Sequence, residues 1–432
     1  MRVNGKVKQQ FIRYIGKNVK TGAVRRVVTN DVKVMEVRRS LDVEVVHRIS
    51  EKLGINDMIP KNSLVLVYSQ LLDRPSINRM EEYLKGTEIL RFLGLKEVNT
   101  EDLYTSLSDL DEIDFERVEE KLSKLFVSIE GEKKSVIVDV TDTYFTGDSL
   151  DSKPRKGKEG RIRKLIQIAL VVTEKRGFPI FHRVYPGNTM TMTIFSDLVK
   201  DLWIRGFNSI VVDRGMISPG ELEDLLKMNF VLIAGIKKSP ELKKIIDSIP
   251  KDEIYSKNGM VRLRKTVVYC KQLDYRGGKM IVVYNPSLES VKRPHFYESS
   301  SDENIARYLG YSLIFHNTPL STADVVKKYY DKDTVERAFK QMKGILDLRP
   351  VRVWLRSHIE SHVKICYLSY AILSYLSFIL EKKGISGPEA LDILKTGYRV
   401  YLKDEKSGFS WESMVNMSGL QKKVVDVVFK KT

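Results

Sequence analysis

Three carboxylates in this chain stand where a metal ion would need them. Asp139 closes the apolar run 135–138, and Asp213 closes the apolar run 208–212, so each is expected at the carboxyl end of a buried strand. Glu336 comes from a helical segment much later in the chain. Carboxylates without His or Cys partners suit Mg²⁺ or Mn²⁺, and two such ions can clamp the attacking and leaving oxygens at a phosphodiester. The pattern therefore predicts metal-dependent phosphoryl transfer.

Other polar side chains compete for these roles. Asp142 lies three residues beyond Asp139, and we favour Asp139 because it ends the apolar run itself. The chain holds 56 acidic residues, so one Asp after an apolar run is weak support on its own. His358 and His362 stand at helical i,i+4 spacing and could face a phosphate, but structural histidines are the preferred interpretation.

The segment 328–343 must position Glu336. Read as one helix at about 100° per residue, it places polar side chains on one stripe and apolar side chains on the neighbouring stripe. The plainer interpretation is a solvated face of charge pairs. A break at 331–334 is the alternative, because Asp333 can cap a new helix. The polar stripe consists of Tyr329, Lys332, Glu336 and Lys343.

Composition favours a polyanionic partner. The 432 residues carry 73 Lys or Arg against 56 Asp or Glu, a net charge of +17, which points to nucleic acid ahead of a membrane surface. The hydrophobic fraction of 42% can fill the cores of two or three domains. Two cysteines and no export pattern favour a reducing, cytoplasmic setting. The apolar run 365–380 is short for a bilayer and is predicted to be a buried helix.

The carboxylates need a sheet to bring them together, and residues 131–236 supply its pattern. Short apolar runs alternate with amphipathic segments, which is typical of an α/β fold with a mixed sheet. A β-rich insertion is expected over 238–310, with a hairpin at Gly277 and Gly278. The predicted strands cover 135–142, 166–172, 178–184, 208–213, 230–236, 261–270 and 279–284, and helices are predicted over 194–203 and 222–228.

The flanking segments are basic or helical. Residues 1–40 hold eleven Lys or Arg against two acidic residues, which suggests a short β-ribbon that contacts DNA or merely solubilises the terminus. Residues 41–130 show helical spacing, with a helix end at Gly54 and a cap at Thr100, and fit a DNA-binding domain or a plain packing domain equally. Residues 386–432 are expected to form a helical tail with a basic end.

On these residues the chain resembles the DDE transposases of prokaryotic insertion sequences, in the IS-four-like branch. That group carries a Y-x2-R-x3-E-x6-K signature around its catalytic Glu, and this chain has the same spacing with Lys332 in place of the Arg. The segments around Asp139 and Asp213 resemble the two Asp motifs of the group. The resemblance covers about residues 131–385 well and 1–130 loosely.

The resemblance implies an RNase H-like catalytic core over 131–385, interrupted by the insertion, an N-terminal helical DNA-binding domain over 1–130, and the tail. It implies a transposase that binds terminal inverted repeats, cleaves at the ends with two Mg²⁺ or Mn²⁺ ions, and joins the 3′-OH to target DNA as a homodimer. Such a protein would be cytoplasmic and nucleoid-associated on DNA. A nuclease without strand transfer and a domesticated DNA-binding protein are the alternatives.

The resemblance also assigns roles to residues. Asp139, Asp213 and Glu336 would bind metal and catalyse, and Tyr329, Lys332 and Lys343 would bind DNA. Lys332 offers a point charge where the Arg of the group offers a planar fork. The insertion has no Trp to receive a flipped base, although Tyr255, Tyr269 and Tyr275 could stack instead. Apart from the resemblance, the basic loop 153–164 is predicted to hold the DNA backbone beside the site, because it follows the strand of Asp139; its DNA-binding residues are Lys156, Lys158 and Arg161.

Overall fold

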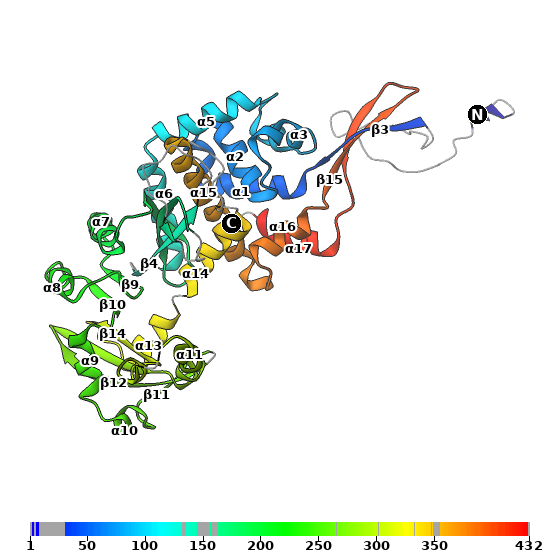
Figure 1. Ribbon diagram of the computed structural model, residues 1–432. Coiled ribbons are helices and arrows are strands. Elements are labelled where there is room, and N and C mark those ends of the chain that lie inside the picture. Colours follow the sequence, from blue (N-terminus) through cyan, green and yellow to red (C-terminus); the bar gives the residue numbers. More distant parts are fainter. Residues whose placement is uncertain are drawn as a thin grey trace.

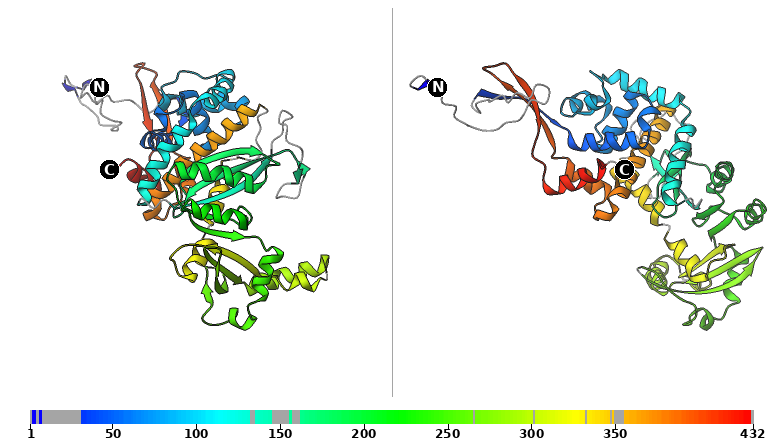
Figure 2. Two further views of the ribbon diagram at one scale, coloured as in Figure 1. Left: turned by 90° about the vertical axis from the view of Figure 1, so that its left-hand side faces the viewer. Right: turned by 180° about the vertical axis from the view of Figure 1, so that it is seen from behind.

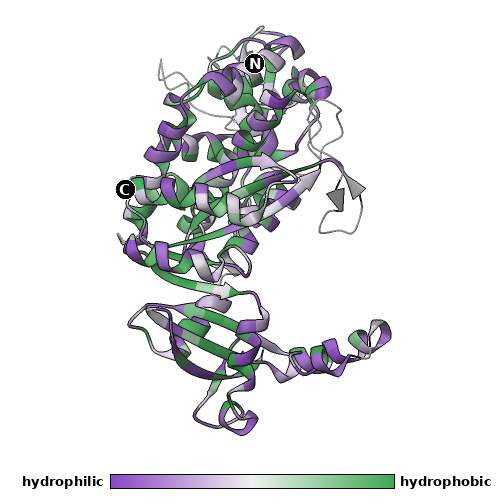
Figure 3. Cartoon of the chain, turned by 60° about the vertical axis from the view of Figure 1, so that its left-hand side comes forward, coloured by the Kyte–Doolittle hydropathy of each residue, from purple (hydrophilic) through white to green (hydrophobic). Residues whose placement is uncertain are grey.

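A nine-stranded sheet runs through the protein, with helices packed on both faces (Figure 1). The computed structural model describes residues 2–3, 6–7, 31–131, 135–144, 155–156, 162–264, 266–300, 302–331, 333–346, 348 and 355–430. The strand order is β11-β12-β13-β14-β10-β9-β4-β7-β8. In Figure 3 the strands are largely hydrophobic, while polar residues are concentrated on the outer helices.

Five neighbouring strands at one end of the sheet, with β8 at its edge, form the RNase H-like part. β7 pairs antiparallel with both β4 and β8, whereas β9 is parallel to β4 and β10 is parallel to β9. The order β10-β9-β4-β7-β8 with these directions confirms the predicted fold. The five strands are β4 (Ser135–Tyr144), β7 (Leu165–Thr173), β8 (Pro179–Pro186), β9 (Ser209–Val212) and β10 (Val231–Ile236).

Both faces of this sheet are buried, which is why its strands read as continuous apolar runs. Val136 and Val138 of β4 face a core shared with α7 (Thr191–Ile204) and α8 (Pro219–Lys227). Ile137, between them, faces a second core, shared with the helices of 41–130 and with the long helix α15 (Arg356–Leu380). The alternation of side chains along β4 therefore separates two cores.

The insertion extends the same sheet. β14 (Tyr311–His316) pairs antiparallel with β10, and β13 (Gly278–Tyr284), β12 (Val267–Tyr275) and β11 (Met260–Arg262) follow outward. Arg276 and Gly277 both have positive φ, as a tight hairpin turn requires, so the predicted hairpin is confirmed. Its helices are α9 (Pro240–Asp247), α10 (Lys251–Ile254), α11 (Pro286–Ser299) and α12 (Glu303–Ala306).

One strand prediction inside the insertion is wrong. The single strand expected over 261–270 is two strands, because β11 ends at Arg262 and β12 begins at Val267. The amide of Leu263 donates to the carbonyl of Thr266, and this turn reverses the chain so that the two strands pair with each other.

The helical layer of residues 41–130 surrounds α15. The buried helix predicted over 365–380 is confirmed and longer: α15 has the length and composition to cross a membrane, yet 72% of its apolar window is buried inside the protein. The cap of α5 is Asn99, not Thr100, since the Asn99 side chain accepts the amide of Asp102. The layer consists of α1 (Leu41–Lys52), α2 (Lys61–Leu72), α3 (Met80–Lys85), α4 (Ile89–Leu93), α5 (Thr100–Glu112) and α6 (Phe115–Glu130), with short 3-10 turns at Ile55–Asp57 and Ile77–Arg79.

The expectation of a helical tail over 386–432 is wrong in part. α16 (Gly387–Leu394) and α17 (Gly419–Val428) enclose a hairpin of β15 (Tyr398–Asp404) and β16 (Ser410–Met414). Residues 399–403 read Arg-Val-Tyr-Leu-Lys, and the Val and Tyr in this run are residue types that favour strands. β15 also pairs with β3 (Val32–Arg39), and this three-stranded sheet extends away from the helical layer (Figures 1 and 2).

The predicted N-terminal ribbon falls mostly outside the described residues. Within them, β1 (Arg2–Val3) pairs antiparallel with β2 (Lys6–Val7), and residues 8–30 carry the rest of that prediction.

Candidate active site

Asp139 and Asp213 start from neighbouring positions on parallel strands. The last paired residues of β4 and β9 are Val138 and Val212, and each Asp is the next residue along its strand. Because neighbouring strands lie about 4.8 Å apart, the two carboxylates leave the sheet side by side. Ile137 and Val211 both enter the core shared with α15, so by alternation both Asp side chains leave from that same face.

One expectation about Asp139 is wrong. It does not end its strand, because β4 continues to Tyr144 in antiparallel pairing with β7, where Asp139 opposes Leu170. It is the parallel partner β9 that stops, which opens one side of β4 at the position of Asp139. The rival Asp142 lies three residues on and therefore projects from the opposite face of β4.

Tyr329 contacts Asp213 directly. The Tyr329 hydroxyl donates to Oδ1 of Asp213 at 3.3 Å, and the same oxygen accepts the amide of Arg214 at 2.6 Å. Burial raises the pKa of Tyr329, and the negative charge of Asp213 raises it further, so the hydroxyl remains a protonated donor. Gly235 on β10 leaves the space for it, since a Cβ there would lie 2.1 Å from the Tyr329 oxygen.

The helix predicted over 328–343 is broken, so a continuous polar stripe is the wrong interpretation and the alternative break is correct. α13 (Thr322–Tyr330) ends before Asp331, α14 (Asp333–Lys340) follows, and a π-helical turn covers Gln341–Ile345. The carbonyl of Asp331 accepts the amide of Thr334 at 3.3 Å across the break. As Figure 1 shows, α13 lies with the strands of the insertion and α14 lies beside β4.

The other signature residues lie on different elements near β4. Lys343, in the π-helical turn, donates to the Thr141 hydroxyl, two residues beyond Asp139 on the same face of β4. Glu336 is exposed on α14, while Val335 and Phe339 of that helix are buried against the sheet. Lys332 lies outside the described residues.

The basic loop is described only in part. Lys156 lies in β5 (Arg155–Lys156), which pairs with β6 (Ile162–Arg163), whereas Lys158 and Arg161 lie outside the described residues. Of the two histidines, His358 is buried, bonds the hydroxyl of Ser108 at 3.1 Å and stacks on Tyr104, which agrees with a structural role.

The described carboxylates fit a hard cation, but as a pair. Within the described part of the chain, no three His, Cys, Asp or Glu side chains lie close enough together to hold a metal. Asp139 and Asp213 form an all-oxygen pair, and Mg²⁺ is commonly held by one or two carboxylates together with water and substrate phosphates. The donor chemistry therefore suits Mg²⁺ or Mn²⁺.

Sequence reasoning missed a group of cations beside this pair. Arg214 follows Asp213 directly, and Lys237 and Lys238 follow the end of β10. Their positions in the sequence could have pointed to them, because side chains just after the carboxyl ends of parallel strands line the crevice where ligands bind in open α/β sheets.

Fold and site together define an RNase H-like enzyme with a carboxylate pair on its parallel strands. The family model of the transposase DDE domain matches residues 130–372, more than half of the chain. The chain belongs to this family and is a DDE transposase.

Two further comparisons add context. A piggyBac transposase, solved as a synaptic complex with hairpin DNA, is similar to this chain with a TM-score of 0.48 and 10% identity, over 82% of this chain and 76% of that one. No curated protein sequence matches.

Proposed function

We propose that this DDE transposase binds the terminal inverted repeats of its own insertion sequence, cleaves at the ends and joins the freed 3′-OH to target DNA. The observation that carries the proposal is the equal register of Asp139 and Asp213 on parallel β4 and β9, inside the segment that matches the family. The net charge of +17 supports DNA as the partner. The signature spacing favours the IS-four-like branch of prokaryotes, and with it a cytoplasmic, nucleoid-associated protein that acts as a homodimer.

In this proposal Asp139, Asp213 and Glu336 hold two Mg²⁺ or Mn²⁺ ions. When bound, such ions activate the attacking oxygen and stabilise the leaving one. Tyr329 fixes the orientation of Asp213 through its hydrogen bond. Lys343 carries its charge along the face of β4 that holds Asp139, where it can meet a phosphate of the DNA end. Lys332, Lys156, Lys158 and Arg161 are proposed to contact the DNA backbone.

Glu336 lies on α14, so the position of α14 decides whether Glu336 reaches Asp139 and Asp213. This helix has eight residues and lies between the break after Tyr330 and a π-helical turn, both of which are places where a helix can change its path. We propose that α14 adjusts when DNA and metal bind, bringing Glu336 to the carboxylate pair.

The test uses purified protein and a DNA fragment that carries the element's end. Asp139→Asn, Asp213→Asn and Glu336→Gln should each reduce cleavage more than about a hundredfold, because metal stabilisation of the transition state amounts to several kcal/mol. DNA affinity should persist in all three variants, and excess chelator should stop cleavage by the native protein.

The matched control is Asp142→Asn. Asp142 lies on the same strand but projects from the opposite face, so this variant should cut normally. A cutting-competent Asp139→Asn protein would refute the assignment. Pre-cut ends offered with target DNA then separate a transposase, which joins them, from a nuclease, which does not.

A further inference from the structure

Five cations gather at the carboxyl ends of β9 and β10, beside Asp213. Arg214 is the next residue after Asp213, and Lys237 and Lys238 follow β10. The stem of Lys237 lies against Gly215, where a Cβ would sit 2.4 Å from Lys237 Cε, so the segments after the two strands are in contact. On α9, Lys243 Nζ lies 4.9 Å from the centre of the Tyr308 ring, and Tyr308 is the residue whose carbonyl binds Lys238; Lys292 on α11 adds a further charge that acts on Lys238.

The positive charge of this group is not balanced by ion pairs. Within the described residues, none of the five cations forms an ion pair with a carboxylate. The nearby Asp247 is already engaged, since it accepts from Tyr308 Oη and Arg307 Nη2, both at 2.6 Å. Lys238 is partly buried, and its Nζ donates to the carbonyl of Tyr308 at 2.7 Å.

The surroundings of Lys238 disfavour its charged form. Burial, followed by the charges of Arg214, Lys292 and Lys243, lowers the pKa of Lys238 to about 8. Like charges held together at a partly desolvated position repel one another, and a bound anion would relieve that repulsion. The site is therefore suited to an anion that arrives next to Asp213.

We propose that Arg214, Lys238, Lys243 and Lys292 bind a backbone phosphate of DNA next to the bond that is cut at Asp139 and Asp213. The proposal rests on the function proposed above, because it takes the DNA path past the carboxylate pair. Arg214 links the two sites, since its backbone amide donates to Asp213 and its side-chain charge acts on Lys238. The role is distinct from that of the basic loop 153–164, which follows β4 and not β10.

The first experiment measures binding of labelled end DNA in the presence of chelator, so that no cleavage occurs. Lys238→Met keeps the apolar stem and removes the charge, while Lys243→Gln and Lys292→Gln remove exposed or half-buried charges with little effect on folding. Each should weaken binding about 3- to 30-fold and reduce the salt dependence of affinity.

The matched control is Lys244→Gln. It removes the neighbouring lysine of α9, which is exposed and is not among the charges acting on Lys238, so binding should change less than twofold. If Lys238→Met fails to fold, the exposed Lys292→Gln carries the same test. Unchanged affinity and salt dependence in the folded cluster variants would overturn the proposal.

The second experiment uses pH. A phosphate beside Lys238 raises its pKa above the value of about 8 in the free protein, so binding takes up a proton between the two values. DNA affinity should therefore fall as pH rises above 8, by at most tenfold per pH unit for one proton. Lys238→Met should remove this pH dependence. Lys238→Arg should keep the DNA affinity of the native protein but should also lack the pH dependence.

These outcomes separate the two proposals. Weak binding by the cluster variants in a protein that never cuts its ends would leave the phosphate site standing and refute the transposition proposal. Normal cutting and normal binding by the cluster variants would refute the phosphate site and leave the transposition proposal standing. Inorganic phosphate serves as the alternative ligand: if it alone produced the pH effect and DNA did not, the site would bind free phosphate and the DNA assignment would be wrong.

Discussion

Tyr329 reaches Asp213 because residue 235 has no side chain. Its ring crosses β10 at Gly235, where a Cβ would also lie 2.8 Å from the Tyr329 Cζ. The contact joins α13 to the strand end that carries a predicted metal ligand. Sequence spacing predicted Tyr329 as a DNA-binding residue, but it could not show that a glycine on β10 admits the hydroxyl, because that close approach arises only when β10 and α13 pack together.

Gly235→Ala should destabilise the protein by about 1–3 kcal/mol, the usual cost of forcing an extra methyl group into a packed site. It should also slow cleavage more than the stability loss explains, since it displaces the tyrosine hydroxyl from Asp213. Urea denaturation and end-cleavage rates measure the two effects. In a protein that already carries Tyr329→Ala, the clash is gone, so adding Gly235→Ala should cost at most half of what it costs in the native protein. Strictly additive losses would contradict the steric explanation.

Tyr329→Phe tests the hydroxyl alone. The ring and its packing remain, so the free energy of unfolding should fall by about 1 kcal/mol or less, the contribution of one hydrogen bond. Cleavage should slow about tenfold, because Asp213 loses a fixed donor. A rate within twofold of the native protein would show that this hydrogen bond does not orient Asp213 during the reaction.

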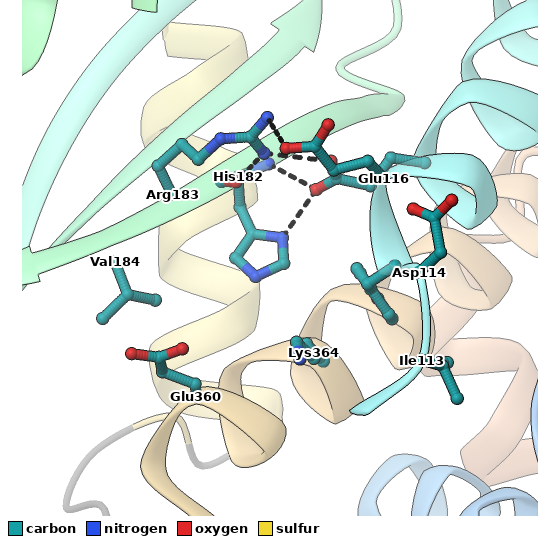
Figure 4. A pocket seen from close by; sticks show the side chains of 10 residues that line it. Ile113, Asp114, Glu116, His182, Arg183, Val184, Glu360 and Lys364 are labelled. Atoms are coloured by element: carbon teal, nitrogen blue, oxygen red, sulfur yellow. Dashed lines mark hydrogen bonds and ion pairs between the residues drawn. The ribbon is translucent and has the colours of Figure 1, made fainter. Parts of the chain in front are cut away.

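At the scale of elements, Glu119 fastens α6 to the catalytic sheet. Its side chain is 1% exposed and meets His182 Nδ1 at 2.9 Å, Arg183 Nη1 at 3.1 Å and Arg205 Nη2 at 3.3 Å. Figure 4 shows the surroundings of this contact, with His182 and Arg183 of β8 beside Glu116 of α6. Burial on its own would raise the pKa of Glu119, but the hydrogen bond and charge of His182, with the charge of Arg183, lower it below 4.5.

Glu119→Gln should destabilise the protein by about 3–5 kcal/mol, because it leaves buried cations without their carboxylate. The control is Glu116→Gln on the same helix, which also pairs with Arg183 but has a side chain that is 72% exposed and should cost about 0.5 kcal/mol or less. Urea denaturation of both variants gives the comparison, and equal losses would show that Glu119 is not the fastening.

The same carboxylate sets a dependence on acid. Since its folded pKa is lowered, its stabilisation is complete above the unfolded value near 4.5 and is lost as pH falls through the folded pKa. The stability of the native protein should therefore decline more steeply below pH 4.5 than that of Glu119→Gln. Parallel curves over that range would exclude Glu119 as the titrating group.

How much of these elements the sequence predicts depends on the origin of each signal. Most strands of the RNase H-like part are predictable because they are buried on both faces and read as apolar runs, as in β7. The site is predictable to the extent that Asp139 and Asp213 follow such runs. The break after Tyr330 is decided by packing, since α13 packs on the insertion strands and α14 on β4, and helical periodicity alone allowed both interpretations.

At the scale of the whole molecule, the helices of 41–130 and the C-terminal helices share one core. Buried residues of α1, α2, α5 and α6 join those of α15, α16 and α17 in a single cluster. Local sequence patterns could not predict this, because the partners are separated by the entire catalytic segment. The proposed DNA-binding domain over 1–130 therefore lacks part of its core when it is expressed alone.

A chain that ends at residue 385 should be strongly destabilised. The truncation removes β15, the partner of β3, and uncovers the core positions filled by Leu391, Leu394, Val424 and Val428. Losing several buried aliphatic side chains exceeds the cost of about 2–5 kcal/mol for one. Thermal unfolding and protease sensitivity measure the effect, and a truncated protein as stable as the full chain would contradict the shared core.

The pairing of β3 with β15 joins two segments that the ribosome makes far apart in time. The ribosome makes residues 32–39 well before residues 398–404, so the first strand waits until the whole catalytic segment has been made before it finds its neighbour. At about 5–20 residues per second, the wait lasts roughly 20–70 s. A product whose synthesis stops before residue 398 therefore carries β3 without this partner strand.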